Sequence, residues 1–404
     1  MSNKRRTEAD EDISKLRRKA KVPKFDQKTA TREIKEHFSK RLTGSEVVLT
    51  TRTPKGQVLD WVKASSQVKG GRIASPPPIT ELPSFKNGKM DPQLAGFELF
   101  SKRAKLGPEG TVPILHKDVT KLPKGRSLDN ILSKSGRPVK LLRMSDEVEI
   151  AMPATSGHVY AYSSESRTCY GGEGSLSLFD PYVAHADEFS LLQIALTRGS
   201  GSGLQTIEAG VQEYRDLYGD WVPHLFVFYT TNGYTSSGDN KGGYNRDVDG
   251  WVQYSSRIYP GARFTVYSER GGAQYEVPIK YQLWEGNWWF RCLDEWVGYY
   301  PASLFNSSGL RSQADVIHFY GEIVDSGDYS GKTATDMGSG YWPDYHWQWS
   351  AYMHNLRYQR TTGGSMSDYN GSGWASDTAL YDIETHMSSG SSWGSYQWLG
   401  GPGA

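Results

Sequence analysis

Residues 199–212 read GSGSGLQTIEAGVQ, and this stretch decides how the rest of the chain is interpreted. Its glycine-rich start predicts a turn, and the residues that follow predict a half-buried β-strand. Successive side chains of a strand point to opposite faces. Glu208 therefore lies on a small and polar face, which carries Leu204, Thr206, Gly210 and Gln212, and the opposite face carries Gln205, Ile207, Ala209 and Val211. A carboxylate in this position indicates a cleft on the polar face.

A second stretch, His318–Ser326 (HFYGEIVDS), has the same character and places Glu322 between Tyr320 and Val324 on one face. Two carboxylates on two strands suggest a catalytic pair. In a low-dielectric cleft such a pair keeps one proton, so that one acid can activate water at acidic pH while the other polarises a carbonyl and protonates the leaving amine. The alternative is that Glu208 and Glu322 are separate residues of ordinary strands. Glu295, in LDEWVGYYP, is a rival for the second acid.

Short β-rich runs separated by Gly, Ser, Asn and Asp follow residue 144, and helical periodicity is weak there. This pattern predicts an all-β fold, an antiparallel β-sandwich or β-barrel. The expected strands are Val159–Ser163, Gly174–Phe179, Ser190–Thr197, Leu204–Gln212, His224–Thr231, Gly250–Tyr254, Gln274–Leu283, Asn287–Leu293, Val316–Ile323 and Ser350–Tyr358. The Gly/Ser-rich residues 361–404 are expected to form a loosely attached tail.

Charge divides the 404-residue chain in two, although its net charge is only +1. Residues 1–143 hold 32 Lys and Arg against 15 Asp and Glu, whereas residues 144–404 hold 14 against 30. A basic segment can bind nucleic acid. It can also bind the acidic part of its own chain, and the near cancellation of charge favours this second interpretation. We therefore expect a propeptide or inhibitory segment and no nucleic-acid partner.

Residues 1–143 are expected to be a basic pro-segment of short helices, a β-hairpin and a linker. Helical spacing is found in Ile13–Ala20 and Thr31–Leu42, and Glu46–Thr51 with Gln57–Val62 read as the hairpin. From Pro76 to about residue 140 the composition predicts an extended linker. Residues 144–360 are then expected to form a β-rich catalytic domain.

Other catalytic and targeting patterns do not occur. Gly201 stands where a nucleophile elbow requires Ser, and the same loop lacks the Lys-Ser/Thr of a phosphate cradle. The nine His have no metal-ligand spacing, so neither a metal nor an organic cofactor is expected. Cys169 and Cys292 permit one disulfide or none. No secretory signal or membrane-spanning run is visible, and no membrane partner is expected.

Aromatic residues, abundant after residue 143, have two interpretations: they line a cleft that stacks on proline or sugar rings, or they fill the core. Tyr229, Tyr234 and Trp289 are the candidates for substrate contact.

Several motifs together resemble the neprosin family, glutamic peptidases that cleave after proline. They run from about Pro153 to Tyr358 and read EFSLLQIAL, GSGSGLQTIEAGVQEYRDLYGD, HLFVFYTTNGY, GNWWFRCLDEWVGYYPASLF, HFYGEIVDSG and TDMGSGYWPD. The resemblance implies a β-sandwich peptidase with Glu208 and Glu322 as the catalytic glutamates. It also implies a secreted zymogen whose N-terminal activation domain is removed or displaced in acid, and peptide or protein substrates with a preference for proline.

The chain departs from the family pattern at Val211, where Trp is common, at Tyr320, where Gly is common, and at GDNKGGYN, which lacks a cysteine. These departures concern the substrate pocket more than the glutamates. Two other functions therefore stay open: a carbohydrate-active or carbohydrate-binding sandwich, in which paired carboxylates also serve, and a non-catalytic family member that only binds peptides.

Overall fold

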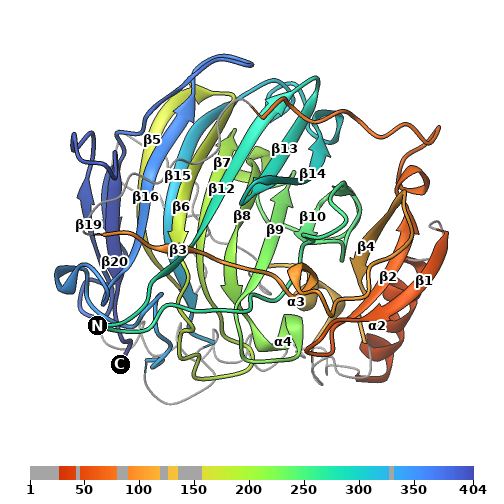
Figure 1. The fold of residues 1–404 in the computed structure, drawn as a ribbon, viewed down its shortest axis with the longest axis horizontal. Helices are drawn as coiled ribbons and strands as arrows, with labels where there is room; N and C mark the ends of the chain where they lie inside the picture. The colour runs from red at the N-terminus through yellow and green to blue at the C-terminus, as the bar shows by residue number, and fades with distance from the viewer. Residues whose placement is uncertain (1–26, 42–45, 80–89, 119–125, 135–156, 327–331) are drawn as a thin grey trace, which may run out of the picture.

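The computed structural model describes residues 27–41, 46–79, 90–118, 126–134, 157–326 and 332–404. Two large antiparallel sheets pack face to face, and a smaller N-terminal unit lies at one side (Figure 1). The prediction of an all-β sandwich is confirmed. The expected helix at Ile13–Ala20 lies outside the described residues.

The first large sheet has seven strands and contains both candidate glutamates. Their order is β10 (Gly242–Tyr244), β9 (His224–Thr230), β8 (Gln205–Glu213), β7 (Ser190–Arg198), β15 (Ala314–Val324), β5 (His158–Cys169) and β18 (Ser372–Ala375).

The second large sheet covers the inner face of the first. Its main path is β11 (Val252–Gln253), β14 (Glu295–Pro301), β13 (Asn287–Cys292), β12 (Tyr275–Trp284), β6 (Gly171–Ser177), β16 (Ala351–Gln359), β20 (Tyr396–Gly400) and β19 (Asp382–His386). Two short strands complete it: β17 (Met366–Asp368) pairs with β16, and β3 (Gln93–Leu94) pairs in parallel with β12.

The main core lies between the sheets and follows the alternation predicted for β8. Ile207 and Ala209 are fully buried there, and Ile279 and Tyr281 of β12 join them in the same apolar cluster. Burial of such side chains is the main stabilising contribution to a sandwich. Because the apolar face of β8 points inward, Glu208 points away from the core, onto the outer face of the seven-stranded sheet.

The N-terminal segment has more regular structure than the sequence predicted. Helix α2 (Gln27–Arg41) and the hairpin of β1 (Val47–Arg52) and β2 (Val58–Lys63) lie where they were expected. The stretch from residue 76 to 140, however, is not a plain linker. It contributes β3, β4 (Thr111–Leu115) and α3 (Leu128–Leu132), and β4 completes a three-stranded sheet with β2.

Residues 361–404 correct another expectation, because they are not a loose tail. They supply β17 to β20 to the two sheets. Tyr369, Tyr381 and Leu399 are fully buried in the main core. These isolated large residues anchor a segment whose Gly/Ser content alone suggested a loosely attached tail.

Cys169 and Cys292 are both buried and free, so they do not form a disulfide. In the described ranges no helix is long and apolar enough to cross a membrane.

Candidate active site

Strand β7 separates the two strands that carry the glutamates. Ala195 of β7 pairs with Glu208 of β8, and Leu191 of β7 pairs with Glu322 of β15. Ala195 and Leu191 each lie two positions from Gln193, and side chains two positions apart in a strand point to the same face. Glu208, Gln193 and Glu322 therefore share the outer face of the sheet. Residues that are 114 positions apart in the sequence thus meet over one polar side chain of the intervening strand.

Glu208 is fully buried and accepts hydrogen bonds from several neutral donors. Tyr234 Oη donates to Oε1 at 2.5 Å and Thr206 Oγ1 to the same atom at 2.8 Å. Gln193 Nε2 donates to Oε2 at 2.9 Å. Hydrogen bonds to a carboxylate stabilise its charged form.

Glu322 is 1% exposed and lies beside a histidine. His158 Nδ1 is 2.6 Å from Oε1 of Glu322. The ring of Tyr160 follows, stacked on His158 with 6.2 Å between centroids.

Lys134 of the N-terminal segment joins the two acids. Its Nζ lies 2.6 Å from Oε2 of Glu208 and 3.1 Å from Oε2 of Glu322. It also donates to Oε1 of Gln193 at 2.7 Å. Three aromatic rings surround the ammonium at 5.6–5.7 Å from their centroids, those of Phe226, Phe228 and Tyr320. One cation therefore occupies the space between the candidate catalytic oxygens.

Electrostatics at this cluster are dominated by the bridging cation. Burial by itself raises the pKa of both glutamates, but attraction to Lys134 and the hydrogen bonds outweigh it, so both pKa values are lowered. Burial lowers the pKa of Lys134, yet Glu208 and Glu322 raise it overall. We expected one proton to be shared by the acids. With Lys134 in place, the lowered pKa values instead favour the ionised form of both acids, because the ammonium compensates their repulsion.

Helix α3 positions Lys134, which follows it in the chain. Ser127 and Asn130 form a capping box at the start of that helix. Ser237 of the β9–β10 connection donates its backbone N–H to Oδ1 of Asp129 at 3.0 Å, and Ile131 and Leu132 are buried. The helix is thus fixed to the seven-stranded sheet just before Lys134.

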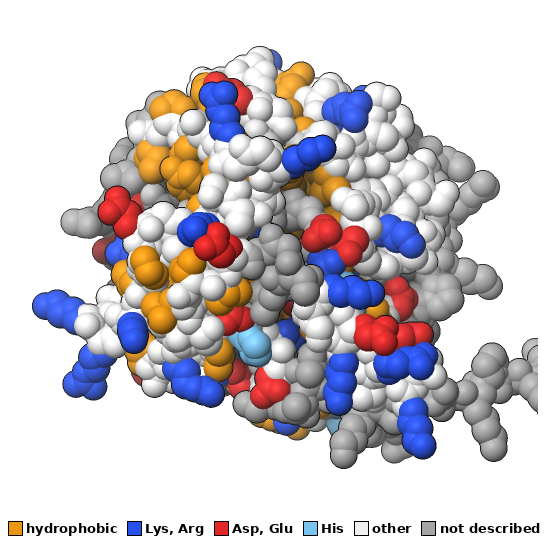
Figure 2. All heavy atoms as spheres, turned by 90° about the vertical axis from the view of Figure 1, so that its right-hand side faces the viewer, with side chains coloured by type: hydrophobic (Ala, Val, Ile, Leu, Met, Phe, Trp, Pro, Cys, Tyr) orange, Lys and Arg blue, Asp and Glu red, His pale blue; other side chains and the backbone are white. Residues whose placement is uncertain are grey.

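Further ion pairs join the basic segment to the acidic sandwich. Lys117 Nζ lies 2.9 Å from Oδ2 of Asp247, and Arg126 lies 2.6 Å from Oδ2 of Asp187. Arg41 pairs with both Asp239 and Asp249. On the face of the molecule that carries the N-terminal unit, acidic and basic side chains are interspersed rather than gathered in one patch of either sign (Figure 2). The charge asymmetry of the sequence is therefore partly neutralised by contacts between the two halves.

Tyr234 reaches Glu208 because of an unusual turn after β9. Gly233 and Tyr234 have φ angles of 64° and 60°, in the left-handed region. A Cβ at Gly233 would lie 2.1 Å from the carbonyl oxygen of Gly201, so only glycine fits there. The turn brings the Tyr234 ring over Phe228 with 5.9 Å between centroids. Left-handed backbone at a bulky residue is rare and is concentrated at functional sites.

Of the three aromatic residues expected to contact substrate, the structure brings only Tyr234 to the glutamates. Tyr229 is fully buried between the sheets, where its hydroxyl donates to the carbonyl of Asp249. Trp289 lies on the other sheet, in a cluster with Trp296 and Tyr299. Neither placement permits contact with a substrate at Glu208.

The rival acid Glu295 also lies elsewhere. It stands at the start of β14 in the ten-stranded sheet, where Arg257 pairs with it and Ser255 donates to it at 2.7 Å.

Sequence reasoning missed Gln193, His158 and Lys134. Gln193 had a signal, because it is the one strongly polar side chain in the apolar run SLLQIAL. His158 and Lys134 had none, because the contacts that bring them to the glutamates are made only in the folded chain. In the part of the chain that the structure describes, no three His, Cys, Asp or Glu side chains gather in a way that could hold a metal ion.

Two solved structures are similar to a part of this chain. Sheep galectin-11 in complex with glycerol is 13% identical, with a TM-score of 0.22 over 40% of this chain and 90% of its own. CG-16, a homodimeric agglutinin from chicken liver, is 9% identical, with a TM-score of 0.21 over 41% of this chain and 93% of its own.

A family model described as Neprosin matches residues 186–402, more than half of the chain. The matched region contains both Glu208 and Glu322 together with the C-terminal strands. A match to this family supports a peptidase-type function in general terms. This chain belongs to the Neprosin family.

Proposed function

We propose that the protein is an acid-acting glutamic endopeptidase that hydrolyses peptide bonds, with a preference for the bond after proline. The observation that carries the proposal is the shared contact of Glu208 and Glu322 with a single ammonium group. Two carboxylates that can touch one cation can also hold one water molecule once the cation has left. The preference for proline rests on the family resemblance.

In the proposed mechanism, Lys134 is withdrawn and the two glutamates then share one proton, because two adjacent carboxylates cannot both ionise in a dry site. The ionised glutamate removes a proton from water as the water oxygen bonds to the peptide carbonyl carbon. The protonated glutamate polarises the carbonyl and then gives its proton to the nitrogen as the C–N bond breaks. The neutral donors around Glu208 favour it as the ionised partner.

The N-terminal segment acts as an intramolecular inhibitor in this proposal. Lys134 occupies the space that water needs, and the ion pairs of Arg41, Lys117 and Arg126 fix the segment to the acidic sandwich. Acid protonates the carboxylates, weakens these contacts and opens the site. Salt weakens the exposed pairs as well.

Glu208→Gln and Glu322→Gln test the catalytic pair. Each is expected to abolish hydrolysis of a proline-containing peptide at acid pH, after the N-terminal segment has been removed, without loss of the fold. Glu295→Gln is the matched control and retains activity, because Glu295 lies on the other sheet. Full activity in Glu208→Gln would end the proposal, and saturable peptide binding without turnover in the wild type would favour a non-catalytic binding protein.

Acidification of the purified full-length protein to about pH 3, which is below the ordinary pKa values of Asp and Glu, tests latency. Mass spectrometry is expected to record loss of roughly the first 140 residues, followed by activity. Activity of the intact chain at neutral pH, with Lys134 still attached, would contradict the inhibitory role but not the catalytic one.

A further inference from the structure

The N-terminal segment covers a group of large side chains on the outer face of the ten-stranded sheet. Trp288 and Phe290 of β13 belong to the main core, so Trp289 between them points outward. Four side chains form one aromatic surface on this face: Val252, Trp289, Trp296 and Tyr299. Ile73 and Ala74 of the N-terminal segment pack against it, and each of the four is at most 6% exposed. Part of this burial therefore comes from the N-terminal segment.

Two hydrogen bonds join the backbone of the covering segment to the aromatic surface. Ala74 donates its N–H to Oη of Tyr299 at 3.3 Å. Trp296 Nε1 donates to the carbonyl oxygen of Pro77 at 3.0 Å. Pro77 is buried, although residues 72–79 form neither a helix nor a strand. The two contacts lie three residues apart in the chain, which is about one turn of a polyproline II helix.

Residues 75–78 read Ser-Pro-Pro-Pro, and this sequence fixes the conformation of the covering segment. The ring of each proline holds its φ angle at about −65°. Ser75, Pro76 and Pro77 each precede a proline, which restricts them to extended conformations. The segment is therefore preorganised as polyproline II, and its binding to the aromatic surface loses little conformational entropy.

This contact uses the chemistry by which proteins recognise proline-rich peptides. Such peptides bind in grooves lined by aromatic side chains as preformed polyproline II helices. Trp296 supplies a ring and an N–H donor for a proline carbonyl. Trp289 Nε1 is also buried and has no hydrogen-bond partner among the described residues. The aromatic surface thus contains a second indole donor that the covering segment does not use.

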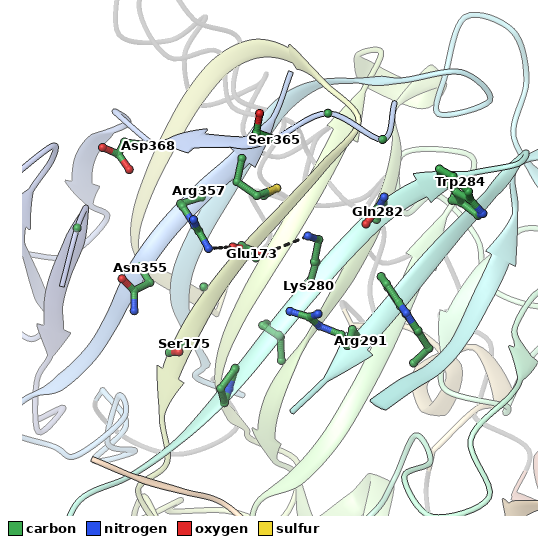
Figure 3. Close-up of a pocket in the computed structure, with 18 of the residues that line it drawn as sticks. Glu173, Ser175, Lys280, Gln282, Trp284, Arg291, Asn355, Arg357, Ser365 and Asp368 are labelled. Atoms are coloured by element: carbon green, nitrogen blue, oxygen red, sulfur yellow. Dashed lines mark ion pairs between the residues drawn. The ribbon is translucent and has the colours of Figure 1, made fainter. Parts of the chain in front are cut away.

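The surface continues beyond the prolines into a cavity of about 740 Å³ on the same face. Pro78 and Trp296 line this cavity, together with Gln282 and Trp284 of β12, which Figure 3 labels. Trp284 is half-buried and also packs against the aromatic surface. Ligand pockets commonly have this size. A chain that extends past Pro78 would meet a further aromatic ring and an amide group there.

We propose that the aromatic surface is a docking site for a proline-rich segment of the substrate, and that residues 72–79 occupy it in the full-length chain. The proposal rests on the proposed function, because removal of the N-terminal segment is what exposes the surface. Glu208 and Glu322 lie on the outer face of the other sheet. The docking site therefore holds the substrate and takes no part in the hydrolysis.

Fluorescence anisotropy at pH 7 tests the docking site on the full-length chain. The probe is a labelled peptide of residues 72–79 (RIASPPPI), and the comparison peptide has serine at its three proline positions. The triple variant Pro76→Ser, Pro77→Ser and Pro78→Ser loosens the covering segment. This variant is expected to bind the probe at least about tenfold more tightly than the wild type, whose tethered segment competes at a high effective concentration. The serine peptide should not bind measurably.

Two further changes in the triple variant locate the binding site. Trp296→Phe keeps a ring but removes the N–H donor, and it is expected to weaken binding about fivefold, the equivalent of one hydrogen bond. Tyr299→Phe removes the acceptor for the N–H of Ala74 and provides a second measurement if Trp296→Phe does not fold. Trp374→Phe is the matched control, because Trp374 is an exposed tryptophan of β18 in the other sheet. Circular dichroism establishes that each variant is folded.

The proposal is overturned if the triple variant does not bind the probe, if the serine peptide binds equally well, or if neither Trp296→Phe nor Tyr299→Phe changes the affinity. Binding at pH 7 requires no hydrolysis, and Lys134 still lies between the glutamates. A protein that binds the probe but never cleaves a peptide would therefore refute the proposed function and support the docking site. An active peptidase that fails to bind the probe would have the opposite meaning.

Discussion

The ammonium of Lys134 lies 2.6 Å from Oε2 of Glu208, inside the cluster of candidate catalytic groups and not at its entrance. Both side chains are almost completely buried, at 2% and 0% exposed. A buried charge without a partner is strongly destabilising. The acid pair and the segment that covers it are therefore energetically coupled.

Lys134→Met is expected to change how stability depends on pH. In the wild type both glutamates have pKa values below the ordinary 4.5, so their contribution to stability is fully present above that pH and is lost as pH falls. Without the cation, burial raises the pKa of at least one acid, and the variant loses stability as pH rises. Thermal unfolding should be followed between pH 5 and pH 8. The free energy of unfolding of Lys134→Met should be lower than that of the wild type by roughly 3–5 kcal/mol at pH 7. This difference should become smaller at pH 5.

The control for this experiment is Lys102→Met, which removes an exposed lysine from the same segment. Its pH dependence should follow that of the wild type. Parallel curves for Lys134→Met and Lys102→Met would contradict the coupling.

Tyr234→Phe is expected to alter the pH profile of the activated enzyme. The hydroxyl donates to Oε1 of Glu208 at 2.5 Å, and its loss should raise the pKa of this acid. The acidic limb of kcat/KM should move upward by about one pH unit, the equivalent of one charged hydrogen bond. Tyr229→Phe removes a hydroxyl between the sheets and should leave the limb in place. A shift in both variants would mean that the effect is not local.

Gly210→Ala is expected to disturb the pairing of β7 with β8. A Cβ at this position would lie 1.9 Å from the carbonyl oxygen of Leu192, so the two strands would have to separate beside Gln193. The loss of stability should exceed about 3 kcal/mol, the upper range for overpacking. Gly203→Ala is the matched change, because nothing lies within 4 Å of its Cβ and its φ is not positive. Chemical denaturation measures both, and equal stabilities would contradict the close approach.

Glu213→Gln is expected to stabilise the protein at neutral pH. Burial, and then repulsion from Asp180, raise the pKa of Glu213 to about 9. The folded state therefore binds a proton that the unfolded state releases above pH 4.5, and stability falls as pH rises from there toward 9. An uncharged amide removes this penalty. Glu213→Gln should therefore raise the free energy of unfolding by roughly 1–3 kcal/mol at pH 8 and leave it unchanged at pH 4. Thermal midpoints at the two pH values measure the difference, and an equal gain at both would exclude ionisation as the cause.

Much of the sandwich could be predicted because strand alternation is a local property. The apolar face of β8 is readable from Ile207, Ala209 and Val211 alone, and the same alternation places Glu208 on the other face. The C-terminal strands could not be predicted, because Gly and Ser dominate their composition and only packing shows that Tyr369 and Tyr381 anchor them. The β-strand at Thr111–Leu115 was not predicted either, because its partner strand β2 lies about 50 residues earlier in the chain.

By itself the sequence determined which faces of the strands are apolar, where the acidic residues stand on them and how charge is divided along the chain, because each depends on neighbouring residues only. Tertiary structure alone decided that Lys134 stands between Glu208 and Glu322, and that Tyr229 faces the core while Tyr234 faces the acids. Strand order and register bring together residues that are far apart in the sequence, and no local pattern encodes which distant strands become neighbours.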